Sequence, residues 1–116
     1  MDVAGPGENR IYECAATAWD AMAGDETAIR IVIEGRVQGV WFRAWTAERA
    51  QELGLSGWVR NRRDGSVEAL FAGPEPVVRH MIEQCRDGPP LARVERIVEA
   101  PETGPVGPGF RTLPTV

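Results

Sequence analysis

The sequence predicts an α+β fold in which an antiparallel sheet carries two helices on one face. Short stretches with apolar residues at every second position alternate with two stretches in which apolar residues recur at helical spacing. Gly and Pro residues separate these stretches. The chain has 116 residues, which is enough for one domain with a single core that needs neither a metal nor a disulfide.

The pattern begins with a strand and a helix. Residues 29–33 place three Ile side chains on one face of a strand, and Gly35 and Gly39 interrupt it. A helix is expected over residues 41–53, because apolar and small side chains recur there at helical spacing and Gly54 stands where a C-terminal cap belongs.

A hairpin follows this helix. Residues 55–60 and 66–72 predict two strands, and the second has alternating apolar side chains on one face. The Asp64-Gly65 pair between them is typical of a hairpin turn.

The last third of the chain predicts a second helix and two further strands. The helix begins near Pro76 and ends before Gly88. Residues 92–100 alternate as a strand, and residues 110–113 predict a further weak strand after a Gly/Pro loop. Two split βαβ units with right-handed crossovers give the ferredoxin-like βαββαβ sandwich.

Residues 1–26 differ from the remainder in composition. They hold one Arg and six acidic residues, a net charge of −5, and are rich in Gly and Pro near the start. We expect an N-terminal extension that is disordered or forms a short helix, with the folded domain over residues 27–116. A natural start at Met22 is the alternative, and under either reading the extension carries no chemistry.

Composition excludes several classes of enzyme. All 13 basic residues are Arg, so neither Schiff-base chemistry nor the Lys of a Walker loop is available. His80 is the single His, so a Ser–His–Asp triad could form only around it. Two Cys and one His cannot close a structural zinc site. We expect no metal and no cofactor.

Charge and cysteine usage indicate partners and compartment. Residues 27–116 hold 12 Arg against 11 acidic residues, a net charge of +1, which does not favour nucleic-acid binding. Cys14 and Cys85 lie in different regions and are typical of reduced thiols. No apolar run approaches the roughly 18 residues of a membrane span. We expect a cytoplasmic monomer without a membrane or nucleic-acid partner.

The segment between the first strand and the first helix has the properties of an anion site. Gly35 and Gly39 let the loop curl so that several N–H groups point inward, and the helix N-terminus adds its positive end. Arg43 falls in the first helical turn, where the helix dipole disfavours a cation unless an anion lies between them. A plain strand–helix connection with a solvent-facing Arg is equally consistent with the spacing.

Two motifs resemble both signatures of the acylphosphatases. They are Gly35-x-Val37-Gln38-Gly39-Val40-x-Phe42-Arg43 and Gly57-Trp58-Val59-Arg60-Asn61-x-x-x-Gly65-x-Val67-Glu68. The resemblance is close over residues 33–73 and extends over about 27–113. The Gly/Pro loop before the last strand and the N-terminal extension depart from the family pattern, and Trp41 stands where the family varies.

The resemblance implies hydrolysis of a carboxyl–phosphate anhydride to a carboxylate and inorganic phosphate, without a metal. It implies that backbone N–H groups of Val37, Gln38, Gly39, Val40 and Trp41, with the Arg43 guanidinium, bind the phosphoryl oxygens. It also implies that Asn61 orients the attacking water. A planar guanidinium matches phosphoryl oxygens well, and a carboxylate leaves without a general acid.

Three other functions remain open at this point. They are an anion-binding module without turnover, RNA binding through the sheet, and the role of the acylphosphatase-like domain of hydrogenase maturation factors, which handles carbamoyl phosphate in much longer chains. Three Trp residues could be a base-stacking platform, although we expect core or cavity-wall positions for Trp41, Trp45 and Trp58. Asp64 and Glu68 are expected in a turn and on a strand surface, rather than as a metal pair.

Overall fold

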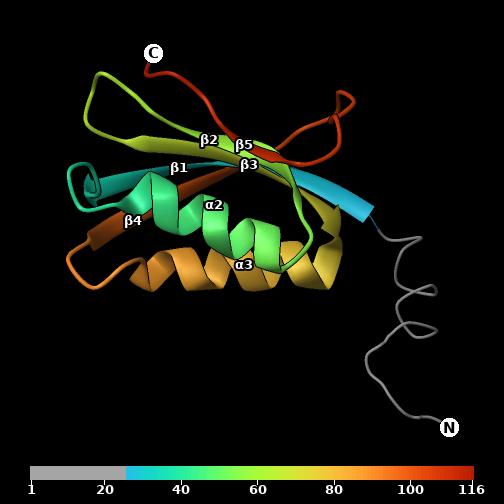
Figure 1. Cartoon of the computed structure of the whole chain (residues 1–116), viewed down its shortest axis with the longest axis horizontal. Coiled ribbons are helices and arrows are strands. Elements are labelled where there is room, and N and C mark those ends of the chain that lie inside the picture. Colours follow the sequence, from blue (N-terminus) through green and yellow to red (C-terminus); the bar gives the residue numbers. More distant parts are fainter. Residues whose placement is uncertain (1–25) are drawn as a thin grey trace, which may run out of the picture.

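The computed structural model describes residues 26–116, so the expected N-terminal extension, including Met22 and Cys14, lies outside the described residues. Five strands form one sheet, and two helices lie side by side on one of its faces (Figure 1). The elements in chain order are β1 (Glu26–Arg36), α2 (Phe42–Glu52), β2 (Ser56–Asn61), β3 (Val67–Pro74), α3 (Glu75–Asp87), β4 (Arg93–Pro101) and β5 (Phe110–Thr112).

The strand order β4-β1-β3-β2-β5 confirms the ferredoxin-like architecture. β1 pairs antiparallel with both β3 and β4, and β2 pairs antiparallel with β3. β5 pairs parallel with β2 through three residue pairs, so the sheet is mixed rather than wholly antiparallel. The sequence pattern marks residues 110–113 as a weak strand, and the three-residue strand found there takes the outer edge beside β2.

The core lies between the sheet and the helices. Ile29, Ile31 and Ile33 are buried on the helix-facing side of β1, as their alternation predicts. The predicted stripe of α2 is buried at Phe42, Thr46 and Ala50. The side of α3 that faces the sheet is buried at Val78, Met81, Ile82 and Cys85.

Two elements differ locally from their predicted form. The first helix begins at Phe42 and not at residue 41, because Trp41 adopts a left-handed conformation with φ 67°. In β4 the simple alternation fails, since a bulge opposite Glu34 and Gly35 inserts an extra residue. Val94 and Ile97, three residues apart, therefore both pack against the core.

The sheet face that carries no helix holds a charged cluster. Glu68 on β3 accepts hydrogen bonds from Arg30 Nη1 at 3.0 Å and from Arg60 Nε at 2.8 Å. The Glu68 side chain is only 8% exposed, so the expectation of a strand-surface position is wrong. Trp58 lies beneath Arg60, with the guanidinium carbon 4.7 Å from the ring centroid. Through these hydrogen bonds, Glu68 on β3 links the neighbouring strands β1 and β2 by side-chain contacts.

The last residues of the chain continue along β2. Leu113 N donates to Val59 O at 2.9 Å, and Val116 N donates to Asn61 O at 3.2 Å. Arg63 N in turn donates to Val116 O at 2.7 Å. The chain end thus supports the end of β2 and the β2–β3 hairpin.

Candidate active site

The loop between β1 and α2 curls because it contains residues with positive φ. Gly39 has φ 74° and Trp41 has φ 67°, and the latter is the only residue other than Gly with positive φ in the described part of the chain. Gly35 has φ 129° at the bulge, where a Cβ atom would collide with the backbone of β4. Gly39 therefore turns the loop as predicted, whereas the expectation that Gly35 interrupts the strand is wrong, because β1 continues to Arg36 and Gly35 instead permits the close approach of β4 at the bulge.

Gln38 anchors this loop to the β2–β3 hairpin. Its Nε2 donates to Arg62 O at 2.6 Å and to Ser66 O at 2.8 Å. Both N–H donors of the Gln38 carboxamide are therefore used within the protein, so the backbone N–H group is the donor that Gln38 can offer to an anion. Two motifs that lie far apart in the sequence are joined by this one carboxamide.

The N-terminus of α2 opens onto the same region. Trp41 is the N-cap residue and makes no side-chain capping hydrogen bond, and no acidic residue lies in the first turn. The half-buried Arg43 lies in that turn, although the dipole disfavours a cation there by about 0.3–1 kcal/mol. Within residues 26–116, Arg43 forms no salt bridge, so an anionic ligand would supply its missing counter-charge.

Asn61 is the last residue of β2, where it pairs with Val67 of β3. The hairpin turn is stabilised by another side chain, because Asp64 Oδ1 accepts hydrogen bonds from Ser66 N at 2.9 Å and Ser66 Oγ at 2.6 Å. These hydrogen bonds lower the pKa of the Asp64 carboxyl. Asp64 thus has the expected turn position, and Asn61 is not needed to cap the hairpin.

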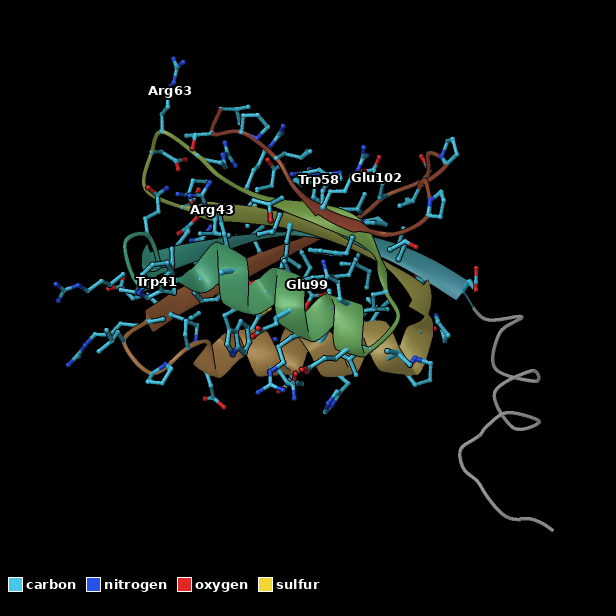
Figure 2. All side chains as sticks on the ribbon, in the orientation of Figure 1. Trp41, Arg43, Trp58, Arg63, Glu99 and Glu102 are labelled. Atoms are coloured by element: carbon cyan, nitrogen blue, oxygen red, sulfur yellow. The ribbon has the colours of Figure 1, made fainter. Side chains whose placement is uncertain are left out.

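A cavity of about 460 Å³ brings the two motifs together. The residues that line it on the side of the loop and α2 are Val37, Gln38, Gly39, Trp41, Phe42, Arg43 and Ala44. On the side of the strands it is lined by Asn61 and Thr112. Arg43 is the one charged residue that residues 26–116 contribute to this lining. Figure 2 shows Trp41 and Arg43 at the end of the sheet where the hairpin with Arg63 also lies. The arrangement suits a small anion with an uncharged substituent.

All the predicted site residues except Val40 line this cavity. Val40 is buried in the core, so only its backbone is available to a ligand. Phe42, Ala44 and Thr112 were not predicted. The first two could have been found as neighbours of Arg43 on the helix, whereas Thr112 reaches the cavity only because β5 pairs with β2.

Other candidate features are not assembled into sites. Arg60 and Arg62 face acidic side chains, Glu68 at 2.8 Å and Asp64 at 3.8 Å, so with Arg63 they do not form an unpaired basic patch. No group of three or more potential metal ligands occurs within residues 26–116. Among these same residues, no helix is long and apolar enough to cross a membrane.

The three tryptophans do not form a common platform. Trp41 is 78% exposed at the cavity, Trp45 packs partly buried against the core, and Trp58 lies beneath Arg60 on the helix-free face. A second cavity of about 500 Å³ lies at the opposite end of the sheet, where Glu26 and Glu102 contribute to its lining. It holds none of the motif residues and is acidic, so it does not suit an anion.

Comparison with known proteins agrees with this geometry. The sequence model of the acylphosphatase family matches residues 29–112. An acylphosphatase of Rhizorhabdus wittichii is 58% identical over 92 residues, which cover 79% of this chain and 93% of that protein. The structure of an acylphosphatase from Coxiella burnetii superposes with a TM-score of 0.74 at 33% identity, covering 78% of this chain and 95% of that one.

A longer protein is also similar. Full-length HypF, solved in a phosphate- and nucleotide-bound form, gives a TM-score of 0.72 at 26% identity. The similarity covers 78% of this chain but only 12% of HypF, whereas the Rhizorhabdus wittichii relative is matched over nearly its whole length. The chain therefore belongs to the acylphosphatase family, and it is an enzyme that hydrolyses acyl phosphates to a carboxylate and inorganic phosphate.

Proposed function

We propose that the phosphoryl group of the substrate binds in the cavity between the β1–α2 loop and the end of β2. The backbone N–H groups of residues 37–41 and the Arg43 guanidinium hold its oxygens, and Asn61 orients the attacking water. One observation carries the proposal: the cavity lining combines a guanidinium that has no ion-pair partner within residues 26–116, a loop turned by positive φ and the Asn61 carboxamide from a separate strand.

The bound anion would balance the local charge. Arg43 and the N-terminus of α2 are both electropositive and lie side by side without an acidic residue in the first turn. A phosphoryl group bound between them offsets the repulsion between these two electropositive groups. The backbone N–H groups and the planar guanidinium donate hydrogen bonds to separate oxygens of that phosphoryl group. The same donors stabilise the charge spread over those oxygens in the transition state.

Asn61 suits the water because a carboxamide can both donate and accept a hydrogen bond. The water oxygen forms a bond to phosphorus while the bond from phosphorus to the acyl oxygen breaks, and the electron pair leaves on the carboxylate. Among the residues that the structure describes, the lining contains no carboxylate, imidazole or thiol that could act as a base. The proton of the water therefore passes to the phosphate product, and positioning supplies most of the rate enhancement.

We propose that the reaction needs neither a metal nor a cofactor. The cavity lining offers one guanidinium, two carboxamides and one hydroxyl, which is a poor ligand set for a divalent cation. Hydrolysis of benzoyl phosphate in excess EDTA tests this directly. Turnover that disappears in EDTA and returns with added Mg²⁺ would show that a metal takes part.

Substitution of the two proposed residues tests their roles. Arg43→Ala and Asn61→Ala should each lower kcat by about 10²–10³-fold, as the loss of one preorganised donor does elsewhere. Arg43→Lys keeps the positive charge but lacks the planar guanidinium, so its kcat should lie between that of the wild type and that of Arg43→Ala. Arg63→Ala, an exposed Arg outside the cavity lining, is the matched control and should retain turnover. Near-full turnover of a folded Arg43→Ala or Asn61→Ala protein would refute the assigned role.

We further propose that the protein works as a cytoplasmic monomer without nucleic acid or membrane partners. The helix-free face pairs Arg30 and Arg60 with Glu68 and covers Trp58, which leaves little to bind RNA. Molar mass by light scattering and RNA binding at two salt concentrations test these points. A dimer at micromolar concentration, or RNA binding that weakens steeply with salt, would contradict them.

We propose that residues 27–116 are the acylphosphatase-like domain and that the N-terminal extension is dispensable for turnover. The family match begins at residue 29 and covers the cavity residues from Val37 to Thr112 that the structure describes. A chain that starts at Met22 should hydrolyse benzoyl phosphate as fast as the full chain. A large loss of kcat on this truncation would assign the extension a part in the site.

A further inference from the structure

Trp41 is the most exposed large apolar side chain in the described part of the chain. It is 78% exposed, compared with 69% for Leu91 and 49% for Val116. It also occupies a left-handed conformation, which is costly for any residue other than Gly. A bulky indole held in this way, in water, at the rim of the cavity, has no structural role in the core.

The other tryptophans of this region are already in contact with partners. Trp45 packs edge-on against Phe42, with ring centroids 5.5 Å apart, and Trp58 lies beneath Arg60. Within residues 26–116, neither an aromatic ring nor a guanidinium stacks on Trp41. Its indole face is therefore available to a ligand in the cavity that it lines.

The cavity is larger and more apolar than a phosphoryl group alone requires. Its volume of about 460 Å³ is in the range of sites for whole small molecules, about 300–1,000 Å³. Apart from Arg43 and the polar groups around it, the lining consists of Val37, Phe42, Ala44 and Trp41. A phosphoryl group held at Arg43 places the adjoining acyl group against these apolar walls, of which Trp41 is the largest.

We infer that Trp41 determines acyl-group specificity, and that the preferred substrates are acyl phosphates with a flat aromatic acyl group that stacks on the indole. This inference rests on the proposed binding of the phosphoryl group at Arg43. Aromatic rings gain stability from offset or edge-on contacts beyond the area that they bury. A methyl group in the place of the aromatic ring would leave the indole in water.

Three substitutions separate the ring from the backbone conformation. Trp41→Asn and Trp41→Gly both tolerate positive φ and remove the aromatic face. Trp41→Phe keeps an aromatic face and the same backbone cost. If the ring acts on the acyl group, the Asn and Gly variants should agree with each other and the Phe variant should resemble the wild type.

The measurement is the ratio of kcat/KM for benzoyl phosphate to that for acetyl phosphate, together with the inhibition constant for inorganic phosphate. The ratio should fall by about two- to tenfold in Trp41→Asn and Trp41→Gly and return in Trp41→Phe. Phosphate has no acyl group, so its inhibition constant should change little. An unchanged ratio, or an equal loss for both substrates with weaker phosphate inhibition, would overturn the inference.

A binding experiment keeps the inference separate from the proposed mechanism. Phenacylphosphonate and acetonylphosphonate resemble the two substrates but carry a methylene group in place of the anhydride oxygen, so they are not hydrolysed. Calorimetric titration should show tighter binding of the phenacyl compound to the wild type and a loss of that preference in Trp41→Asn. Equal affinities in the wild type would overturn the inference, whereas retained turnover in Arg43→Ala would instead refute the proposed phosphoryl site.

Discussion

Replacement of Gln38 tests whether the β1–α2 loop is held against the hairpin by hydrogen bonds. Its Nε2 donates to Arg62 O at 2.6 Å and to Ser66 O at 2.8 Å. Gln38→Ala removes both bonds, and Gln38→Glu keeps the shape of the side chain but replaces the donor with a carboxylate that faces two carbonyl oxygens. The two variants therefore separate the donor from the volume that the side chain fills.

The expected magnitude follows from the partners that remain. Each net hydrogen bond contributes about 0.5–1.5 kcal/mol. Both carbonyls keep a backbone donor after the substitution, because Gly65 N donates to Arg62 O at 3.1 Å and Arg62 N donates to Ser66 O at 2.9 Å. Gln38→Ala should thus lower the free energy of unfolding by about 1–2 kcal/mol. Gln38→Glu should cost more, about 2–3 kcal/mol, because the carboxylate is brought close to two acceptors.

The stability of each variant is measured by urea unfolding, with tryptophan fluorescence as the signal. Turnover is measured by benzoyl phosphate hydrolysis without urea, where the protein is folded. Turnover should fall by about 10–100-fold in both variants, since the loop is no longer tied to the hairpin that directly follows Asn61. Gln51→Ala is the matched control, because Gln51 makes one long bond of 3.4 Å to Phe110 O. A Gln38→Glu protein as stable as the wild type, or more stable than Gln38→Ala, would refute the reasoning.

Three further predictions concern buried and charged groups. Glu68→Gln should lower the free energy of unfolding by about 1–2 kcal/mol, because it leaves two half-exposed guanidinium groups without their shared carboxylate, and an unchanged urea midpoint would contradict this. Burial raises the pKa of the Cys85 thiol to about 12. In a Cys14→Ser protein, a thiol reagent at pH 8 should therefore label Cys85 only after denaturation. Rapid labelling of the native protein would be inconsistent with the packed core. Hydrogen bonds from Ser66 lower the pKa of Asp64, so its contribution to stability is present above the unfolded pKa of about 3.9 and is lost as the pH falls through the lower folded pKa. The difference in urea midpoint between wild type and Asp64→Ala should therefore shrink below about pH 4, and a difference that grew on acidification would show that another group is responsible.

The order of elements could be predicted because each short segment carries its own pattern. Alternating Ile side chains fit only a strand with one buried face, and all three are buried on the helix side. Pro76 near the start and Gly88 after the end of α3 mark that helix through backbone properties alone. Four strands and two helices in this order then allow few arrangements that obey right-handed crossovers.

The loop between β1 and α2 could also be located from the sequence, since Gly39 at a turning point and Arg43 in the first helical turn are local features. The bulge in β4 could not be predicted. It depends on the approach of Gly35 to the opposite strand, where a Cβ atom would collide with backbone atoms. Trp41 as a left-handed N-cap was likewise not visible, because propensity disfavours that conformation for Trp.

The elements, their boundaries to within a few residues, and the two motifs could all be predicted without the structure. Periodicity, turn residues and spacing are properties of a chain segment and need no knowledge of its neighbours. The fold was needed to show that Gln38 holds the loop to the hairpin, that Glu68 is buried between two arginines, and that Thr112 reaches the cavity. Gln38 contacts residues that are 24 or more positions away in the sequence. Thr112 lines the cavity because β5 pairs in parallel with β2. Strand pairing brings such residues together, and no local pattern encodes which side chains then meet.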